Sequence, residues 1–227
     1  MSLVHDFLFG IYPYVALAVF LIGSLIRFDR EQYSWKSDSS QLLRRGQLRL
    51  GNNLFHIGVL LLFTGHLTLL LPKEAYHALG LTTEGKQLLA IVAGTVFGLM
   101  ALVGLILLVH RRLAEPRIRA TSSRMDIVIL LWILATLTLG LITIPFSLGH
   151  RDGAVMVALA NWAQHIVTFR SGAAGLIADV APIYKVHLFF GMTMFLLFPF
   201  SRLVHVWSGF GSIAYLRRPY QIVRSRG

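Results

Sequence analysis

The chain has 227 residues, 56% of them hydrophobic, and a mean hydropathy of +0.67, well above that of a soluble globular protein. It contains no cysteine, which excludes a disulfide, a cysteine-ligated iron–sulfur cluster and a cysteine zinc site on this chain. The formal net charge is +11, but the basic residues lie in the connections between apolar segments. We therefore interpret this charge as a topology signal and expect no binding of nucleic acid.

The apolar residues occur in five blocks, each long enough to cross a lipid bilayer as a helix. Continuous blocks favour spanning helices over a transmembrane β-barrel, whose strands alternate between apolar and polar residues. We predict a single domain over residues 1–227, an all-α membrane protein built as a bundle of five transmembrane helices. These helices are expected at about 4–26, 50–71, 87–109, 126–149 and 183–207.

The basic residues are distributed unevenly among the connections. Sixteen of the 21 Lys and Arg residues lie in segments 27–49, 110–124 and 202–226, and five lie on the opposite side of the predicted bundle. Cytoplasmic connections of membrane proteins carry the excess of basic residues. We therefore predict a multi-pass membrane protein with its N-terminus outside and its C-terminus in the cytoplasm.

The second block, NLFHIGVLLLFTGHLTLLL, carries His56 and His66 in an otherwise apolar stretch. Ionisable residues inside membrane segments are rare and usually functional. Ten residues separate the two histidines, about 15 Å along a helix. Gly58 and Gly65 lie beside them and favour a haem, because a porphyrin needs a wall without side chains.

The third block and the longest outer connection each leave two interpretations open. Gly94 and Gly98 are four residues apart, a spacing that allows close helix approach or leaves room for a flat cofactor. The outer segment 151–181 contains ANWAQHIVTF. It is either an interfacial helix with Trp162 at the level of the lipid headgroups or a plain loop.

The fifth block, within PIYKVHLFFGMTMFLLFPFSRLVHVW, carries His187 and His205. Eighteen residues separate them, so a continuous helix places both imidazoles on one face about 27 Å apart. Pro199 is expected to bend this helix. Arg202 precedes His205 by three residues and is a candidate partner for a haem propionate, with anchoring at the membrane interface as the alternative.

The predicted topology pairs these four histidines by depth. The second and fifth helices run in opposite directions, which brings His56 towards His205 on the cytoplasmic side and His66 towards His187 on the outer side. We predict two bis-histidine b haems stacked across the membrane. Because two imidazoles fill the axial positions of the iron, such haems transfer electrons and catalyse no bond chemistry. The alternative is that some of these histidines are merely buried and hydrogen-bonded.

Four stretches resemble the gamma subunit of respiratory nitrate reductase, a five-helix dihaem cytochrome b, and the similarity runs over essentially the whole chain. They are HIGVLLLFTGH, KVHLFFGMTMFLLFPFSRLVH, IYPYVALAVFLIGS and LGLITIPFS. The resemblance implies that His56 and His205 ligate the inner haem iron and that His66 and His187 ligate the outer one. It also implies a quinol site beside the outer haem at His66, Gly65 and Lys86. The intervening loop PKEAYHALGLTTEG is less similar.

Lys86 also has a physical interpretation of its own. An ammonium at the outer end of a spanning helix can donate a hydrogen bond to a quinol oxygen and stabilise the negative charge that develops there. The alternative is a snorkelling lysine at the membrane interface, which describes most lysines at helix ends.

The resemblance implies a quinol-oxidising, multi-pass subunit of the bacterial cytoplasmic (inner) membrane. It would pass electrons through two b haems to cytoplasmic iron–sulfur and molybdenum subunits, which reduce nitrate. This chain itself would hold no nitrate-reducing centre and no catalytic residue. The alternatives are a cytochrome b subunit of a formate dehydrogenase or hydrogenase, or a transporter or membrane anchor with structural histidines. We expect a basic cytoplasmic surface to dock the soluble partner, or else only to set topology: Arg111, Arg112, Arg117, Arg119, Arg217 and Arg218.

Overall fold

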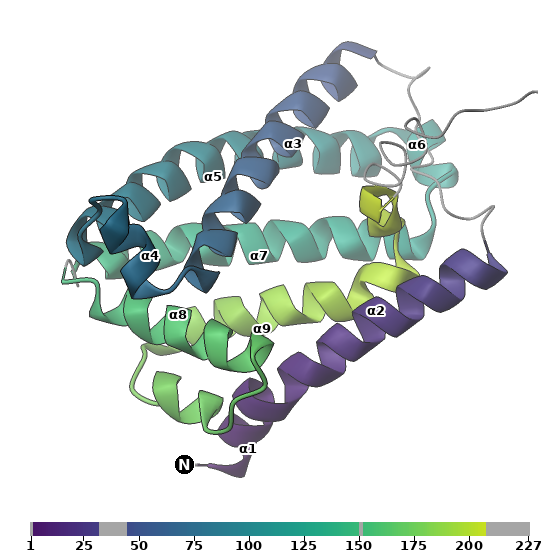
Figure 1. Cartoon of the computed structure of the whole chain (residues 1–227). Helices are drawn as coiled ribbons and strands as arrows, with labels where there is room; N and C mark the ends of the chain where they lie inside the picture. Colours follow the sequence, from purple (N-terminus) through teal and green to yellow (C-terminus); the bar gives the residue numbers. More distant parts are fainter. Residues whose placement is uncertain (1, 32–44, 150–151, 208–227) are drawn as a thin grey trace, which may run out of the picture.

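The computed structural model describes residues 2–31, 45–149 and 152–207. Within these ranges the chain is almost entirely helical (Figure 1), and five helical stretches are long and apolar enough to cross a membrane. They are Leu3–Arg30, Gly46–Leu70, Thr83–Ala114, Arg124–Leu148 and Pro182–Phe200. The predicted all-α bundle of five transmembrane helices is confirmed.

The spanning stretches combine regular helices with short irregular turns. The first half of the chain forms α1 (Leu3–Asp6), the π-helical turn η1 (Phe7–Ile11), α2 (Tyr12–Arg30), α3 (Arg45–Leu67), the 3₁₀ turn η3 (Thr68–Leu70), α4 (Lys73–Ala78) and α5 (Thr83–Ala114). The second half forms α6 (Pro116–Ala120), α7 (Arg124–Leu148), α8 (Ala154–Val167), η4 (Ala173–Ile177), α9 (Pro182–Leu197), η5 (Phe198–Phe200) and η6 (Arg202–Val204).

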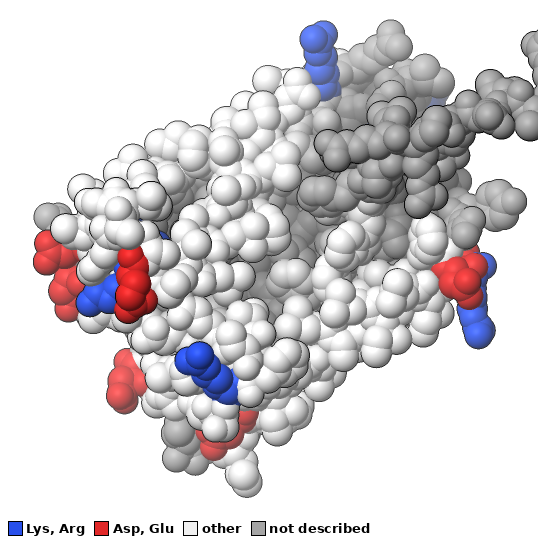
Figure 2. All heavy atoms as spheres, viewed as in Figure 1, with Lys and Arg blue, Asp and Glu red and all other residues white. Residues whose placement is uncertain are grey.

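The long helices form a row in the order α3, α5, α7, α9 and α2, each packed against the next. Their directions alternate along the chain, so that the end of α3 and the starts of α5 and α9 lie at one end of the bundle (Figure 1). The first spanning helix, α2, thus packs on the last one, α9, at the end of this row. Charged side chains lie near the helix ends, and the surface between them is uncharged in Figure 2, as expected of a bundle that crosses a bilayer. Which end faces the cytoplasm stays a prediction.

Glycines set the closest helix contacts. A Cβ atom on Gly58 of α3 would lie 2.8 Å from the Phe97 carbonyl and from Ala101 of α5. A Cβ atom on Gly98 would lie 2.6 Å from Leu141 of α7. Gly58 therefore serves the α3–α5 contact, and its interpretation as a haem wall is wrong. For Gly98 the packing alternative is the right one.

The helix expected at about 183–207, with a bend at Pro199, is broken near that proline and does not continue to residue 207. Helix α9 ends at Leu197, and Ser201 between η5 and η6 has an extended backbone, with φ −121° and ψ 177°. Pro199 explains the break, because it has no N–H for a helical hydrogen bond and its ring clashes with the preceding turn. Arg27 of α2 donates to the carbonyls of Pro199 and Ser201 at 2.7 and 2.8 Å, which compensates for part of the lost helical bonding.

The outer segment is mostly helical and belongs to the core. Trp162 of α8 is 6% exposed and donates its Nε1–H to the Phe9 carbonyl at 2.9 Å, so its placement at the headgroup level is wrong. Around it a cluster of buried residues joins α8, η4, η1, α2 and α9. Gln164 of α8 donates to the Leu69 and Leu71 carbonyls at 3.0 and 3.3 Å. Helix α8 thus fixes the turn that follows α3.

The contact between α3 and α5 gives a direct test. A Cβ on Gly104 would meet the backbone of Phe55 and Gly51, neither of which can move away as a side chain does. We expect Gly104→Ala to lower the free energy of unfolding by about 1–3 kcal/mol through overpacking. Thermal unfolding in mild detergent measures this change. Gly94→Ala on the same helix is the matched control, because its Cβ would be 4.0 Å from Ile144; equal losses in both variants would contradict the packing argument.

Candidate functional site

The structure brings the four membrane histidines together in two pairs. The ring centroids of His56, on α3, and His205, just after η6, lie 6.3 Å apart. Those of His66, on α3, and His187, on α9, lie 6.2 Å apart. The interplanar angles are 63° and 44°. The pairs formed are those that the sequence predicts, while the part that each histidine plays as a ligand stays a prediction.

These separations suit two imidazoles on opposite sides of one metal ion. A bond from a ring nitrogen to a transition metal is about 2 Å, so two such bonds and two ring radii place the centroids ~6 Å apart. Each pair supplies only two protein nitrogens. A porphyrin provides the remaining ligands itself, which makes a haem the fitting occupant.

All four imidazoles also share one hydrogen-bonding pattern. The Nδ1 atoms lie 2.8 Å from the Asn52 carbonyl for His56, 2.7 Å from Leu62 for His66, 3.1 Å from Thr136 for His187 and 2.6 Å from Arg202 for His205. A carbonyl only accepts, so each Nδ1 carries the proton in the neutral imidazole. Each Nε2 therefore keeps a free lone pair, as a metal ligand requires.

Local structure explains how each ring reaches its carbonyl. His56 and His66 reach back one turn along α3. His187 reaches across to α7, where a Cβ on Gly140 would lie 2.9 Å from its ring. Gly140 therefore makes room for the imidazole, a role that the sequence analysis missed because nothing in the sequence relates these two residues.

The break after α9 accounts for the unequal spacing of the two pairs. Ten residues separate the histidines of α3, about 15 Å along its axis, whereas eighteen residues of unbroken helix would span about 27 Å. Because the chain leaves the helix at Pro199 and turns, His205 meets His56 without such a mismatch. A Cβ on Gly23 of α2 would lie 2.9 Å from the Pro199 ring. Gly23 thus allows the turn to pack on α2.

Arg202 is engaged in an ion pair. Its Nε donates to Asp126 Oδ1, at the start of α7, at 2.7 Å. Arg112 lies 3.6 Å from the other carboxylate oxygen and donates to the Ser122 hydroxyl at 2.7 Å. The structure thus gives Arg202 a partner within the chain, and its contact with a haem propionate stays a prediction.

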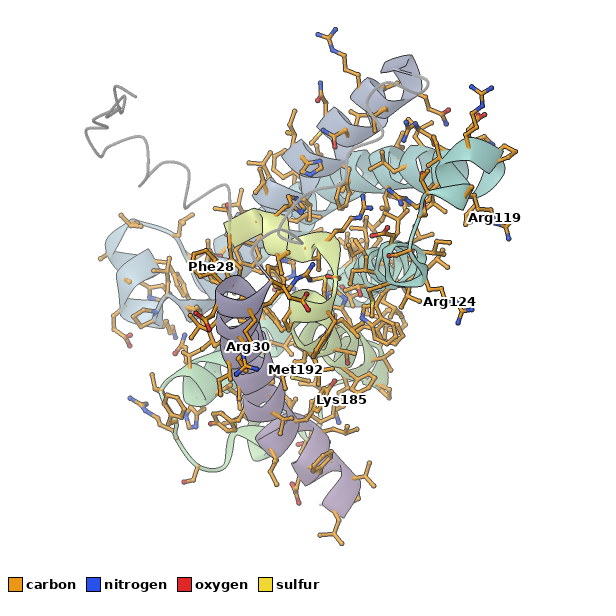
Figure 3. The ribbon with its side chains drawn as sticks, turned by 90° about the vertical axis from the view of Figure 1, so that its right-hand side faces the viewer. Phe28, Arg30, Arg119, Arg124, Lys185 and Met192 are labelled. Carbon is orange, nitrogen blue, oxygen red and sulfur yellow. The ribbon has the colours of Figure 1, made fainter. Side chains whose placement is uncertain are left out.

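The arginines expected on a docking surface separate into three groups. Arg111 is 4% exposed and Arg112 is held by Asp126, so neither projects as a surface charge, and this part of the prediction is wrong. Arg117 and Arg119 are exposed, and Arg119 extends away from the bundle in Figure 3. Arg217 and Arg218 lie outside the described residues.

Lys86 lies inside the protein. It is 6% exposed, its Nζ donates to the Thr68 carbonyl at 2.9 Å, and it stands 4.1 Å from the centroid of the Tyr76 ring. A snorkelling role at the interface is therefore wrong. Thr68 follows His66 by two residues, so Lys86 is tied to the end of α3 that carries the His66–His187 pair. A Cβ on Gly65 would meet no atom within 4 Å, which leaves open space beside His66.

Known proteins similar to this chain share one family. Residues 5–226 match the family described as "Nitrate reductase gamma subunit". The respiratory nitrate reductase 1 gamma chain of Escherichia coli strain K12 is 49% identical over 226 residues, covering 100% of both chains. The respiratory nitrate reductase 2 gamma chain of that strain is 47% identical over 97% of this chain and 96% of its own length. The nitrate reductase gamma chain of Bacillus subtilis strain 168 is 36% identical over 96% and 97%, respectively.

These matches extend over nearly the whole chain, including all five spanning stretches and both histidine pairs. They agree with the bundle architecture, and they place the protein in the inner membrane as a multi-pass subunit. The chain belongs to the nitrate reductase gamma subunit family and is a membrane subunit of a respiratory nitrate reductase.

Proposed function

We propose that the chain is a quinol-oxidising dihaem cytochrome b. In this proposal His56 and His205 hold the inner b haem, and His66 and His187 hold the outer one. The observation that carries it is the set of four Nδ1–carbonyl hydrogen bonds. Ring separations of 6.2 and 6.3 Å, with an unprotonated Nε2 on every ring, support two imidazole ligands for each haem. Merely structural histidines in a transporter or an anchor have no need of this arrangement.

When bound, two b haems supply one-electron carriers between a quinol site and the soluble partners. The protein's part would be to keep each imidazole neutral, to fix the plane of its ring and, by supplying two histidines to each haem, to limit that haem to electron transfer. The histidines of α3 are ten residues apart, so the two proposed haem sites lie one after the other along the axis of this helix.

For the quinol we propose a site beside the outer pair, formed by Lys86, Gly65 and His66. The Lys86 ammonium has three N–H donors, one of which bonds to the Thr68 carbonyl. The cavity next to Lys86 and Tyr76 measures about 20 Å³, which suits a water and not a quinol ring. We therefore place the ring on the exposed side of Gly65 and His66, where the surface opens towards lipid.

We further propose that electrons leave towards a cytoplasmic iron–sulfur subunit and a molybdenum subunit that reduces nitrate. The gamma-chain names of the relatives imply such further subunits. The exposed Arg117 and Arg119 support a basic docking surface at the end of the bundle that carries His56 and His205. Proton release outside and electron transfer inwards would together generate a membrane potential.

His205→Ala tests the pairing. We expect loss of the inner haem with most of the outer haem retained, because His205 faces His56 alone while His66 and His187 keep their own contact. Haem quantification and redox titration of the mutant membranes measure the two haems separately. His110→Ala, an exposed histidine on α5, is the control. Equal loss of both haems in an inserted protein would overturn the assignment.

Lys86→Ala tests the quinol site. We expect quinol binding to weaken roughly tenfold to a hundredfold, because a hydrogen bond from a charged group contributes about 1.5–3 kcal/mol. Lys86→Arg should restore only part of the activity, since a planar guanidinium does not replace a compact ammonium. Quinol-driven reduction of the b haems in membranes measures the effect, and the haem content should not change.

The control for this experiment is Lys73→Ala, which removes an exposed lysine from α4 near the same cavity. Wild-type reduction rates in Lys86→Ala would leave Lys86 with the structural role of tying α5 to Thr68, and the quinol site would lie elsewhere.

A further inference from the structure

The segment that carries His205 differs from those that carry the other three histidines. His56 and His66 bond to carbonyls inside α3, and His187 bonds to a carbonyl inside α7, so regular helices fix all three acceptors. The acceptor for His205 is the Arg202 carbonyl, in a single 3₁₀ turn that follows the extended residue Ser201. Such a short turn does not fix its own position, so other parts of the fold must hold it.

Asp126 holds this turn from the side of α7. Its Oδ1 accepts from Arg202 Nε at 2.7 Å, within the range of a strong charge-assisted hydrogen bond. Its side chain is 14% exposed, and Oδ2 also lies 3.6 Å from Arg112 Nη1. The carboxylate thus joins the end of α5, the start of α7 and the turn η6.

The carboxylate is itself fixed by the start of its helix. Ser123 and Asp126 form a capping box, in which Asp126 N–H donates to Ser123 Oγ at 3.1 Å and Ser123 N–H donates to Asp126 Oδ2 at 3.0 Å. This reciprocal pair restricts the rotamer of Asp126. The position of Arg202 is therefore set by a rigid helix terminus.

We propose that Asp126 is a positioning residue for His205. A continuous path of contacts leads from the Asp126 carboxylate to the Arg202 side chain and, through the Arg202 carbonyl, to the His205 Nδ1–H at 2.6 Å. Asp126 acts on the ring only through Arg202. The inference rests on the proposed role of His205 as a haem ligand, and it adds that α7 controls the orientation of that ligand.

Asp126→Asn tests the inference in membranes that contain the full chain with its partner subunits. The substitution keeps the size of the side chain and removes its charge, so the ion pair between residue 126 and Arg202 is lost. Loss of a group that orients a ligand typically weakens the site tenfold to a hundredfold, and we expect about tenfold weaker binding of the inner haem. We also expect a broadened low-spin resonance of that haem in electron paramagnetic resonance spectra, because this signal reports the relative orientation of the two imidazoles. The outer haem should be unchanged.

Two single variants separate this role from general stability. Ser123→Ala removes the hydroxyl acceptor of the capping box but leaves the two bonds of the Asp126 carboxylate, from the backbone N–H of residue 123 and from Arg202, so the inner haem should keep its resonance. Asp29→Asn removes an exposed carboxylate at the end of α2 and should change neither haem. Asp126→Asn combined with Arg202→Gln should perturb the inner haem no more than Arg202→Gln alone. Each substitution breaks the same interaction, the bond between Asp126 and Arg202.

The inference is overturned if the inner haem of Asp126→Asn has wild-type occupancy and resonance, if Ser123→Ala reproduces the effect, or if the two haems change equally. A wild-type protein without two b haems would instead refute the proposed function. The two failures are therefore distinguishable in the same set of spectra.

Discussion

The bond between each histidine Nδ1–H and a backbone carbonyl is the interaction on which the rest of the arrangement depends. Inside a bilayer no water satisfies a polar group, so each imidazole must find a partner within the protein. A ring that donates through Nδ1 has its remaining nitrogen defined as an acceptor. Four rings fixed in this way form two opposed pairs, and most of the unusual features near them serve to supply the four carbonyls or the space around them.

The broken end of the last spanning stretch shows how much structure one such bond requires. A helix interrupted at Pro199 leaves carbonyls without intrahelical partners, and Arg27 of α2 binds two of them. Phe20 of α2 packs against Phe198 and stacks on Trp207 on either side of the break, with centroid separations of 4.8 and 5.3 Å. The first spanning helix carries no histidine of the two pairs, yet it is the scaffold for the turn that presents His205.

The sequence predicted the number and place of the spanning helices because blocks of apolar residues of membrane length leave few alternatives. It also predicted which histidines meet, since alternating directions fix depth whatever the details of packing. It predicted a bend at Pro199 but not a full break after α9, because proline is tolerated inside membrane helices as well as at their ends. Gly58 and Trp162 were misinterpreted for a similar reason. A glycine beside a helix and a glycine beside a porphyrin look alike in sequence, and a tryptophan suits both a headgroup and a buried carbonyl.

Lys86 places a buried charge at the end of the bundle that carries the His66–His187 pair. A buried ammonium is costly in an apolar surrounding, and the Thr68 carbonyl and the Tyr76 ring offset only part of that cost. Gln164 of α8 binds the carbonyls of Leu69 and Leu71, so two side chains from different helices fix the turn that directly follows His66 and its helix. The same backbone therefore positions His66 and a cation. In the proposed quinol site, an oxygen that bonds to this cation from the open side of Gly65 would lie next to the His66–His187 pair, where electrons could pass to the haem proposed there.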